Sequence, residues 1–146
     1  MIRLFLVFVL VFIPTVSKAE YKWFGFAEDL YLDTTNSIVN GTEIQFYLLF
    51  NNTNTGQSSI SAMGLDCSEL SLTTKSTINY SEPNGKGVNF LEFVYTKEEM
   101  ESRRQFIQPS YPFYDIYNGI CTLGMNRGRE GLQELGFRLY ETQPLE

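Results

Sequence analysis

The feature that most constrains the fold is an alternation of apolar and polar side chains in two stretches of the chain. In residues 44–50 the apolar positions fall on one face, and in residues 70–80 every second position again falls on one face. Those positions are Ile44, Phe46, Leu48 and Phe50, followed by Leu70, Leu72, Thr74, Ile78 and Tyr80. A period of two is typical of a β-strand with one buried side. The pattern therefore predicts an antiparallel sheet packed on a core.

Further strands and turns are predicted around these two stretches. Asn40-Gly41 is a strong two-residue hairpin signal between a short strand at residues 30–33 and the strand at 44–50. A weaker strand is predicted at residues 59–67. Residues 88–95 are apolar on both faces, which predicts a central strand.

Two helices are predicted in the second half of the chain. Thr96 and Glu99 have the spacing of a capping box, and Glu99 stands four residues before Arg103, which favours an ion pair. This first helix is interpreted as a solvated face, with a partner-docking ridge as the alternative.

The second predicted helix has Ser110 as its cap and Pro112 in its first turn. Its buried stripe repeats at helical spacing and consists of Phe113, Ile116, Tyr117, Ile120 and Cys121. Residues 124–131 contain three glycines and are predicted to be flexible. Residues 132–140 fit a short helix or a strand.

The first 19 residues are predicted to be a signal peptide. Arg3 precedes an unbroken apolar run at residues 4–13, and small residues at Ser17 and Ala19 place the cleavage after Ala19. An uncleaved anchor is the alternative, but the run is shorter than the roughly 20 residues that span a bilayer. After cleavage we expect no membrane span, one domain at residues 20–123 and a C-terminal extension at residues 124–146.

The net charge also restricts the partners. The whole chain carries a formal charge of -6. Cleavage removes two basic residues and lowers the charge to about -8. An acidic chain without a basic stripe is a poor candidate for binding nucleic acid or anionic membranes.

The chain has two cysteines, Cys67 and Cys121. Export places them where disulfides persist, and a single pair has one connectivity. We therefore predict a bond between Cys67 and Cys121 that stabilises the fold by roughly 4 kcal/mol. Two free thiols are the alternative. The bond would fasten the second helix to the end of a strand.

The residue inventory argues against catalysis. The chain has no histidine, which excludes Ser-His-Asp and Cys-His mechanisms, and oxidised cysteines leave no thiolate. We predict no catalytic residue, no metal site and no cofactor. Carboxylate chemistry stays open in principle, although no motif supports it. The acidic residues in question are Glu28, Asp29, Asp33, Asp66, Glu69 and Asp115.

Aromatic residues at polar strand positions suggest a binding surface. Tyr47 and Tyr95 are the two candidates, with ordinary core packing as the alternative. Asn40, Asn51 and Asn79 each begin an Asn-x-Ser/Thr triplet, which in a eukaryotic secreted glycoprotein would accept a glycan. We interpret these triplets as chance occurrences.

The order of short motifs resembles the bacterial surface-adhesin protein E family over about residues 28–122. The matching positions are Asp33, Ser37-Ile38, Asp66-Cys67, Pro109-Ser110 and Cys121. The resemblance implies an α+β fold: a single antiparallel β-sheet with a C-terminal helix packed on it and tethered by a disulfide. Two features depart from the family. Ser68, Glu69 and Ser71 replace its basic residues, and residues 124–146 extend past its usual end.

These features together predict an exported, non-enzymatic, adhesin-like binding protein. We expect it in the periplasm or at the cell surface of a Gram-negative bacterium, with an unidentified protein or ligand as its partner. The first alternative is a structural or assembly domain of the envelope that forms a homodimer through an edge strand. The others are a carboxylate-dependent envelope enzyme and a eukaryotic secreted glycoprotein.

Overall fold

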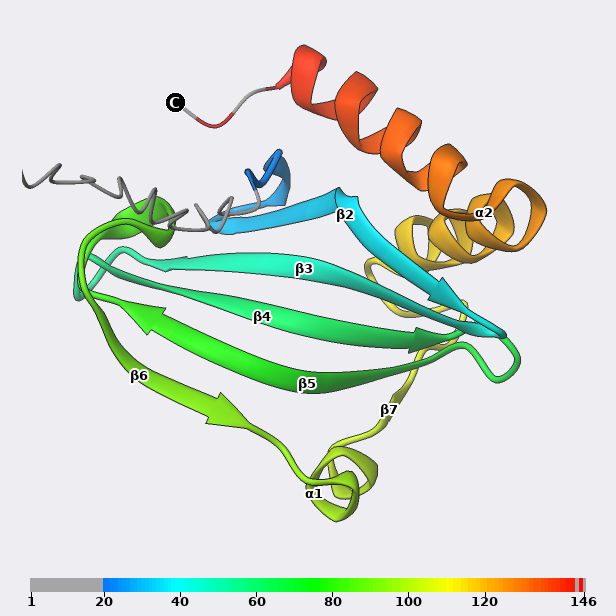
Figure 1. Ribbon diagram of the computed structural model, residues 1–146, viewed down its shortest axis with the longest axis horizontal. Helices are drawn as coiled ribbons and strands as arrows, with labels where there is room; N and C mark the ends of the chain where they lie inside the picture. Colours follow the sequence, from blue (N-terminus) through cyan, green and yellow to red (C-terminus); the bar gives the residue numbers. More distant parts are fainter. Residues whose placement is uncertain (1–19, 144, 146) are drawn as a thin grey trace, which may run out of the picture.

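Seven strands form one curled antiparallel sheet, with a long helix packed on it, in the computed structural model of the protein (Figure 1). The structure describes residues 20–143 and 145, so the predicted signal peptide lies outside the described residues. The strands are β1 (Phe24–Ala27), β2 (Leu30–Asn40), β3 (Glu43–Asn52), β4 (Gln57–Asp66), β5 (Ser71–Tyr80), β6 (Asn89–Val94) and β7 (Gln105–Phe106). The helices are the 3-10 turn η1 (Pro83–Gly85), α1 (Lys97–Ser102) and α2 (Tyr114–Thr142). The predicted α+β fold is confirmed.

Strands β1 to β6 lie side by side in chain order, and β7 pairs with β5. Each of the strands β1 to β6 therefore pairs with its neighbour in the sequence. A hairpin is present where it was predicted, but its loop lies one residue later than Asn40-Gly41, because Asn40 pairs with Glu43 and leaves Gly41 and Thr42 as the loop. The first strand, predicted to be short at residues 30–33, extends to Asn40. Gly41 has a φ of 61°, a conformation that glycine adopts without steric cost.

Strand β5 contains a bulge that the alternation did not reveal. Thr74 of β5 pairs with Met63 of β4, but Ala62, the residue before Met63, pairs with Ser76. Lys75 is the extra residue on β5. A bulge of this kind shifts the phase of the alternation by one residue.

Because of the bulge, the apolar side chains in the two halves of β5 lie on opposite faces of the sheet. Leu72 packs in a core beneath α2, whereas Ile78 pairs with Ile60, and Ile60 and Tyr80 belong to a cluster on the other face. The prediction that Leu72, Ile78 and Tyr80 share one face is therefore wrong.

The sheet buries side chains on both faces. The helix-side core lies between the sheet and α2, and its fully buried members include Ile44, Phe46, Leu65, Ile120 and Leu132. The second core lies on the opposite face. It is built from Trp23, Leu49 and Ile60, with Tyr21, Tyr31, Tyr47, Tyr80 and Leu145 packed around them.

The prediction that all apolar residues at 44–50 share one buried face holds at one end of β3 and fails at the other. Ile44 and Phe46 are fully buried in the helix-side core, but Phe50 is 47% exposed. Residues of α2 lie against the other end of β3: Gly124 packs on Ile44, and the Tyr117 ring lies 6.2 Å from that of Phe46. Leu49, on the other face, is buried instead.

Helix α2 begins at Tyr114, so the prediction that Ser110 caps it is wrong. Its N-cap is Phe113, whose side chain makes no capping hydrogen bond. The predicted stripe is confirmed, because Tyr117, Ile120 and Cys121 are buried and Phe113 and Ile116 pack against the same core.

The region predicted to be flexible is helical. Helix α2 continues to Thr142 and is broken by a sharp change of direction at Gly128 (φ 61°, ψ −154°). The break divides it into two arms, and the second arm runs back across β2 and β1 (Figure 1). Two glycines of α2 serve close packing. A Cβ on Gly124 would lie 2.3 Å from Ile44 Cδ1, and one on Gly136 would lie 2.9 Å from the backbone nitrogen of Thr35.

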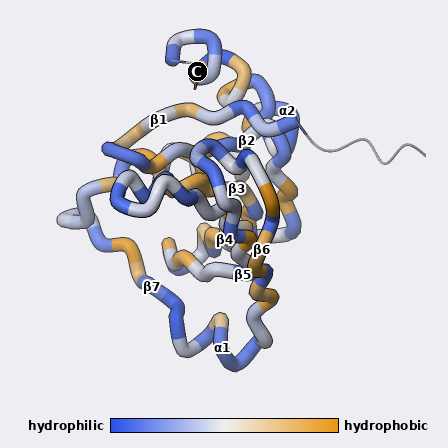
Figure 2. The backbone as a smooth tube through the Cα atoms, turned by 90° about the vertical axis from the view of Figure 1, so that its left-hand side faces the viewer, coloured by the Kyte–Doolittle hydropathy of each residue, from blue (hydrophilic) through white to orange (hydrophobic). Residues whose placement is uncertain are grey.

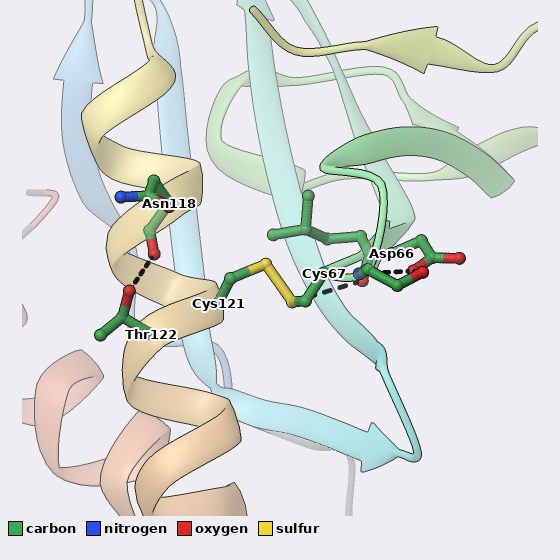
Figure 3. Close-up of a disulfide and its surroundings, with 7 residues drawn as sticks. Asp66, Cys67, Asn118, Cys121 and Thr122 are labelled. Carbon is green, nitrogen blue, oxygen red and sulfur yellow. Dashed lines mark hydrogen bonds between the residues drawn. A yellow bond between two sulfur atoms is a disulfide. The ribbon is translucent and has the colours of Figure 1, made fainter. Parts of the chain in front are cut away.

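The two cysteines form the predicted disulfide. Cys67 follows the end of β4 and Cys121 lies on the first arm of α2, with 5.4 Å between their Cα atoms (Figure 3). The bond fastens the helix to the sheet, as predicted. In the part of the chain that the structure describes, no helix is long and apolar enough to cross a membrane.

Candidate functional site

Strand β6 is the outermost strand of the sheet, so its prediction as a central strand is wrong. All six residues are exposed. The apolar ones on and beside it leave between 44% and 74% of their surface in water: Val88, Phe90, Leu91, Phe93 and Val94. Figure 2 shows the hydrophobic colouring of β6 along one margin of the sheet. Several large apolar side chains exposed on one strand are characteristic of an interaction surface.

The register with β5 shows which faces these side chains occupy. Leu91 lies opposite Asn79, and Phe93 lies opposite Thr77, so both point to the same side. Glu92 and Val94 point to the other side. On its outer margin β6 pairs with no strand among the described residues, so it presents backbone N–H and C=O groups that a further strand can pair with.

Tyr95 continues this surface beyond the end of β6. Its ring stacks on Phe93, with 6.3 Å between centroids and 12° between planes. The Arg103 guanidinium lies 4.5 Å from the centroid of the Tyr95 ring. This cation–π contact takes the place of the predicted ion pair of Arg103 with Glu99, which does not form within the described residues.

Helix α1 positions Arg103 for that contact. The predicted capping box is confirmed: Glu99 N donates to Thr96 Oγ1 at 3.2 Å, and Thr96 N donates to Glu99 Oε2 at 2.8 Å. No residue of α1 is buried, in agreement with the interpretation of a solvated helix. Because the capping box directly follows Tyr95, the start of α1 is held beside the exposed strand.

Tyr47, the other predicted surface residue, lies elsewhere. It is half-buried in the second core, where its ring meets Tyr21 edge to face at 5.2 Å. Gln45 Nε2 donates to its hydroxyl at 3.3 Å. Strands β4 and β5 separate β3 from β6, which places Tyr47 roughly 14 Å from the edge strand at ordinary strand spacing. The fold does not bring Tyr47 and Tyr95 into one site.

Two of the acidic residues that left carboxylate chemistry open, Asp33 and Asp66, are held by local hydrogen bonds. Asp33 is fully buried, and its carboxylate accepts from Thr35 N at 2.7 Å and from Asn36 Nδ2 at 2.7 Å. Burial raises the pKa of Asp33. The carboxylate of Asp66 accepts from Ser68 Oγ and N, and these bonds lower its pKa.

Asp115 lies in the first turn of α2, far in the sequence from Asp33 and Asp66. Across residues 20–143 and 145, no group of three or more His, Cys, Asp or Glu side chains is arranged to hold a metal ion. The local bonds of Asp33 and Asp66 give each carboxylate a structural role, Asp33 where the register of β2 shifts and Asp66 at the end of β4.

Comparison with known proteins gives a fold likeness. No family model and no curated protein matches the sequence. Among solved structures, protein E from non-typeable Haemophilus influenzae aligns with a TM-score of 0.59 and 16% identity, over 84% of this chain and 92% of that one. A second structure of Haemophilus influenzae protein E aligns with a TM-score of 0.50 and 20% identity, over 80% and 92%. The chains share a fold.

The shared fold agrees with the motif resemblance found in the sequence. This chain has both features that the resemblance implies, a sheet with a C-terminal helix packed on it and a disulfide that joins the two. At identities of 16% and 20% the likeness concerns the fold, so what the chain binds has to be argued from its own surface.

Proposed function

We propose that this chain is an exported, non-enzymatic binding protein of a Gram-negative envelope or cell surface, and that it binds a protein through the outer edge of β6. The observation that carries the proposal is the exposure of the whole of β6, with four apolar side chains in a strand of six residues. The fold likeness to protein E, the predicted signal peptide and the lack of histidine support the same function.

The proposed mode of binding is strand addition. A partner segment in extended conformation would pair its backbone with the outer edge of β6 and add a strand to the sheet. Leu91 and Phe93 would contact alternate side chains of that segment on one face. Tyr95 and Arg103 would extend the contact beyond the strand, since aromatic residues and arginine are enriched at interfaces.

A crosslinking experiment tests this site. A photoreactive phenylalanine replaces Phe93 in the purified protein, which is then irradiated with envelope extract and, separately, with extracellular matrix proteins. We expect a discrete adduct that Leu91→Lys abolishes, because a lysine in the interface would be buried without a partner. The matched control carries the probe at Phe137, which is 50% exposed on the second arm of α2.

Equal adducts from positions 93 and 137 would contradict the proposal, and so would the absence of an adduct at position 93 with both sources. Thermal melts of each variant confirm that it is folded. Hydrolase turnover by the purified protein would overturn the non-enzymatic assignment.

The same edge supports a second candidate, a homodimer that forms part of the envelope's structure. Two copies of β6 related by a two-fold axis would pair antiparallel and cover the same apolar side chains on both. Sedimentation equilibrium distinguishes this candidate from the first. A dimer that Leu91→Lys converts to a monomer would favour it, and a monomer at high protein concentration would exclude it.

A further inference from the structure

A groove of about 290 Å³ lies between the two arms of α2, where they pass over the β1–β2 hairpin (Figure 1). Leu135 and Leu139 line it from the second arm, and Phe24 of β1 and Leu32 of β2 line it from the sheet. All four of these side chains are apolar. Strands β1 and β6 are the first and last of the path β1 to β6, so the groove is separate from the site proposed on β6.

The first arm of α2 contributes a stripe of residues at helical spacing. Ile116, Ile120 and Leu123 are aliphatic. Gly119 leaves open space between them, because a Cβ at this position would meet nothing within 4 Å. Among the lining residues Asp115 alone has a polar side chain. The helix rises roughly 12 Å from Asp115 to Leu123, so the carboxylate lies at one end of the stripe.

Each wall of the groove is fastened to the sheet by its own contacts. The disulfide at Cys121 joins the first arm to the end of β4. On the second arm, the Leu132 carbonyl accepts a buried hydrogen bond from Thr34 Oγ1 of β2 at 2.9 Å. The two walls are therefore in place before a ligand arrives. A site that is formed in advance loses little conformational freedom on binding, which favours affinity.

We propose that this groove binds a single hydrocarbon chain that carries a cationic head group. Burial of apolar surface would supply most of the affinity, at about fourfold for each fully buried CH₂ group. Apart from Asp115, the lining offers a ligand no side chain that forms hydrogen bonds. A ligand rich in hydroxyl groups would therefore lose bonds to water without replacing them. The stripe of roughly 12 Å suits a chain of about eight carbons.

The charges near the groove select the sign of the head group. Asp115 is exposed, and its carboxylate forms no hydrogen bond or ion pair with the rest of the chain that the structure describes. The positive end of the helix dipole offsets only about half of its charge. Arg127 and Arg138 line a neighbouring hollow that shares two leucines with the groove, but Glu134 accepts hydrogen bonds from both arginines. An ammonium group beside Asp115 therefore gains attraction, whereas an anionic head group would have to compete with Glu134.

A titration followed by NMR tests the proposal. The methyl groups of the purified protein are observed while octylammonium, 1-octanol or octanoate is added, each below the concentration at which it forms micelles, in buffer of low salt. We expect saturable shifts in the methyl groups that line the groove. Octylammonium should bind about threefold more tightly than 1-octanol, which is an ordinary effect of an exposed ion pair, and octanoate should bind most weakly.

Two variants separate the charge from the groove itself. Asp115→Asn is expected to remove the preference for octylammonium and to leave the affinity for 1-octanol unchanged. Gly119→Leu places a side chain in the open space of the groove and is expected to weaken binding of all three probes at least tenfold. The matched control is Asn118→Leu, which adds the same side chain at an exposed neighbouring position that does not line the groove. Thermal melts confirm that each variant is folded.

Several results would overturn the proposal. One is the absence of saturable shifts with octylammonium, and another is unchanged binding by folded Gly119→Leu. Equal affinities for octylammonium and 1-octanol would identify a site for uncharged hydrocarbon. Tighter binding of octanoate would place the head group at the arginines. Shifts of the same methyl groups on dilution, without any probe, would show instead that a second copy of the chain covers the groove. None of these results bears on binding at β6.

Discussion

Replacing Cys67 and Cys121 together by serine is expected to lower the free energy of unfolding by about 4 kcal/mol. The bond spans 54 residues of sequence, and in the chain-entropy model a crosslink of that span restricts the unfolded chain by about this amount. Cys121 is also buried in the helix-side core, between the first arm of α2 and the sheet. Urea unfolding, followed by circular dichroism, measures the change.

The double substitution avoids the free thiol that a single Cys121→Ser change would leave on Cys67. Wild-type protein kept in reducing agent serves as the internal control and should unfold at the same urea concentration as the double variant. If oxidised wild-type protein and the double variant unfold together, the disulfide contributes no stability and this account of it is wrong.

Gly136→Ala is expected to destabilise the fold by about 2 kcal/mol, although alanine is the better helix former. A Cβ at this position would lie 2.6 Å from Thr35 Cγ2 and 2.9 Å from the backbone nitrogen of Thr35. The backbone of β2 cannot move aside cheaply, so the second arm of α2 has to shift outward. That shift would stretch the buried hydrogen bond that Thr34 Oγ1 donates to the Leu132 carbonyl at 2.9 Å.

Gly119→Ala, in the same helix, is the matched control. A Cβ on Gly119 would meet nothing within 4 Å, so this substitution should stabilise the protein by about 0.5–1 kcal/mol through helix propensity alone. The two melting temperatures are therefore expected to move in opposite directions. If both variants become more stable, the second arm does not pack against β2 as closely as described.

The parts of the fold that could be predicted from sequence are those that local chemistry determines. Asn40-Gly41 marked the hairpin because glycine tolerates the left-handed backbone that the loop uses. The two cysteines could pair in one way only, and the stripe from Phe113 to Cys121 has the period of a helix. Each of these signals depends on a few neighbouring residues.

The incorrect predictions depend on distant contacts. The bulge at Lys75 changes the face of every later residue in β5, but polar residues around it hide the shift in the sequence. Residues 124–131 appeared flexible because they contain three glycines, whereas the helix needs Gly124 to approach Ile44. Gly128 is where the expected irregularity occurs, at the break between the arms.

In the candidate site, too, the features that depend on distant contacts could not be predicted from the sequence. An apolar strand such as residues 88–95 has the same sequence pattern whether it is buried within a sheet or exposed at its edge. The position of this strand at the edge could therefore not be predicted. Tyr95 was predicted to be the last residue of that strand, but β6 ends at Val94, and the stacking of Tyr95 on Phe93 needed the structure.

The chain-order pairing of β1 to β6 also bears on how the protein reaches its folded state. A chain that emerges N-terminus first can form each hairpin as soon as its second strand is available, without waiting for distant segments. Cys121 emerges long after Cys67, when β3 and β4 can already be paired. The disulfide would then close over a largely assembled sheet, so the step that needs an oxidant falls late in maturation.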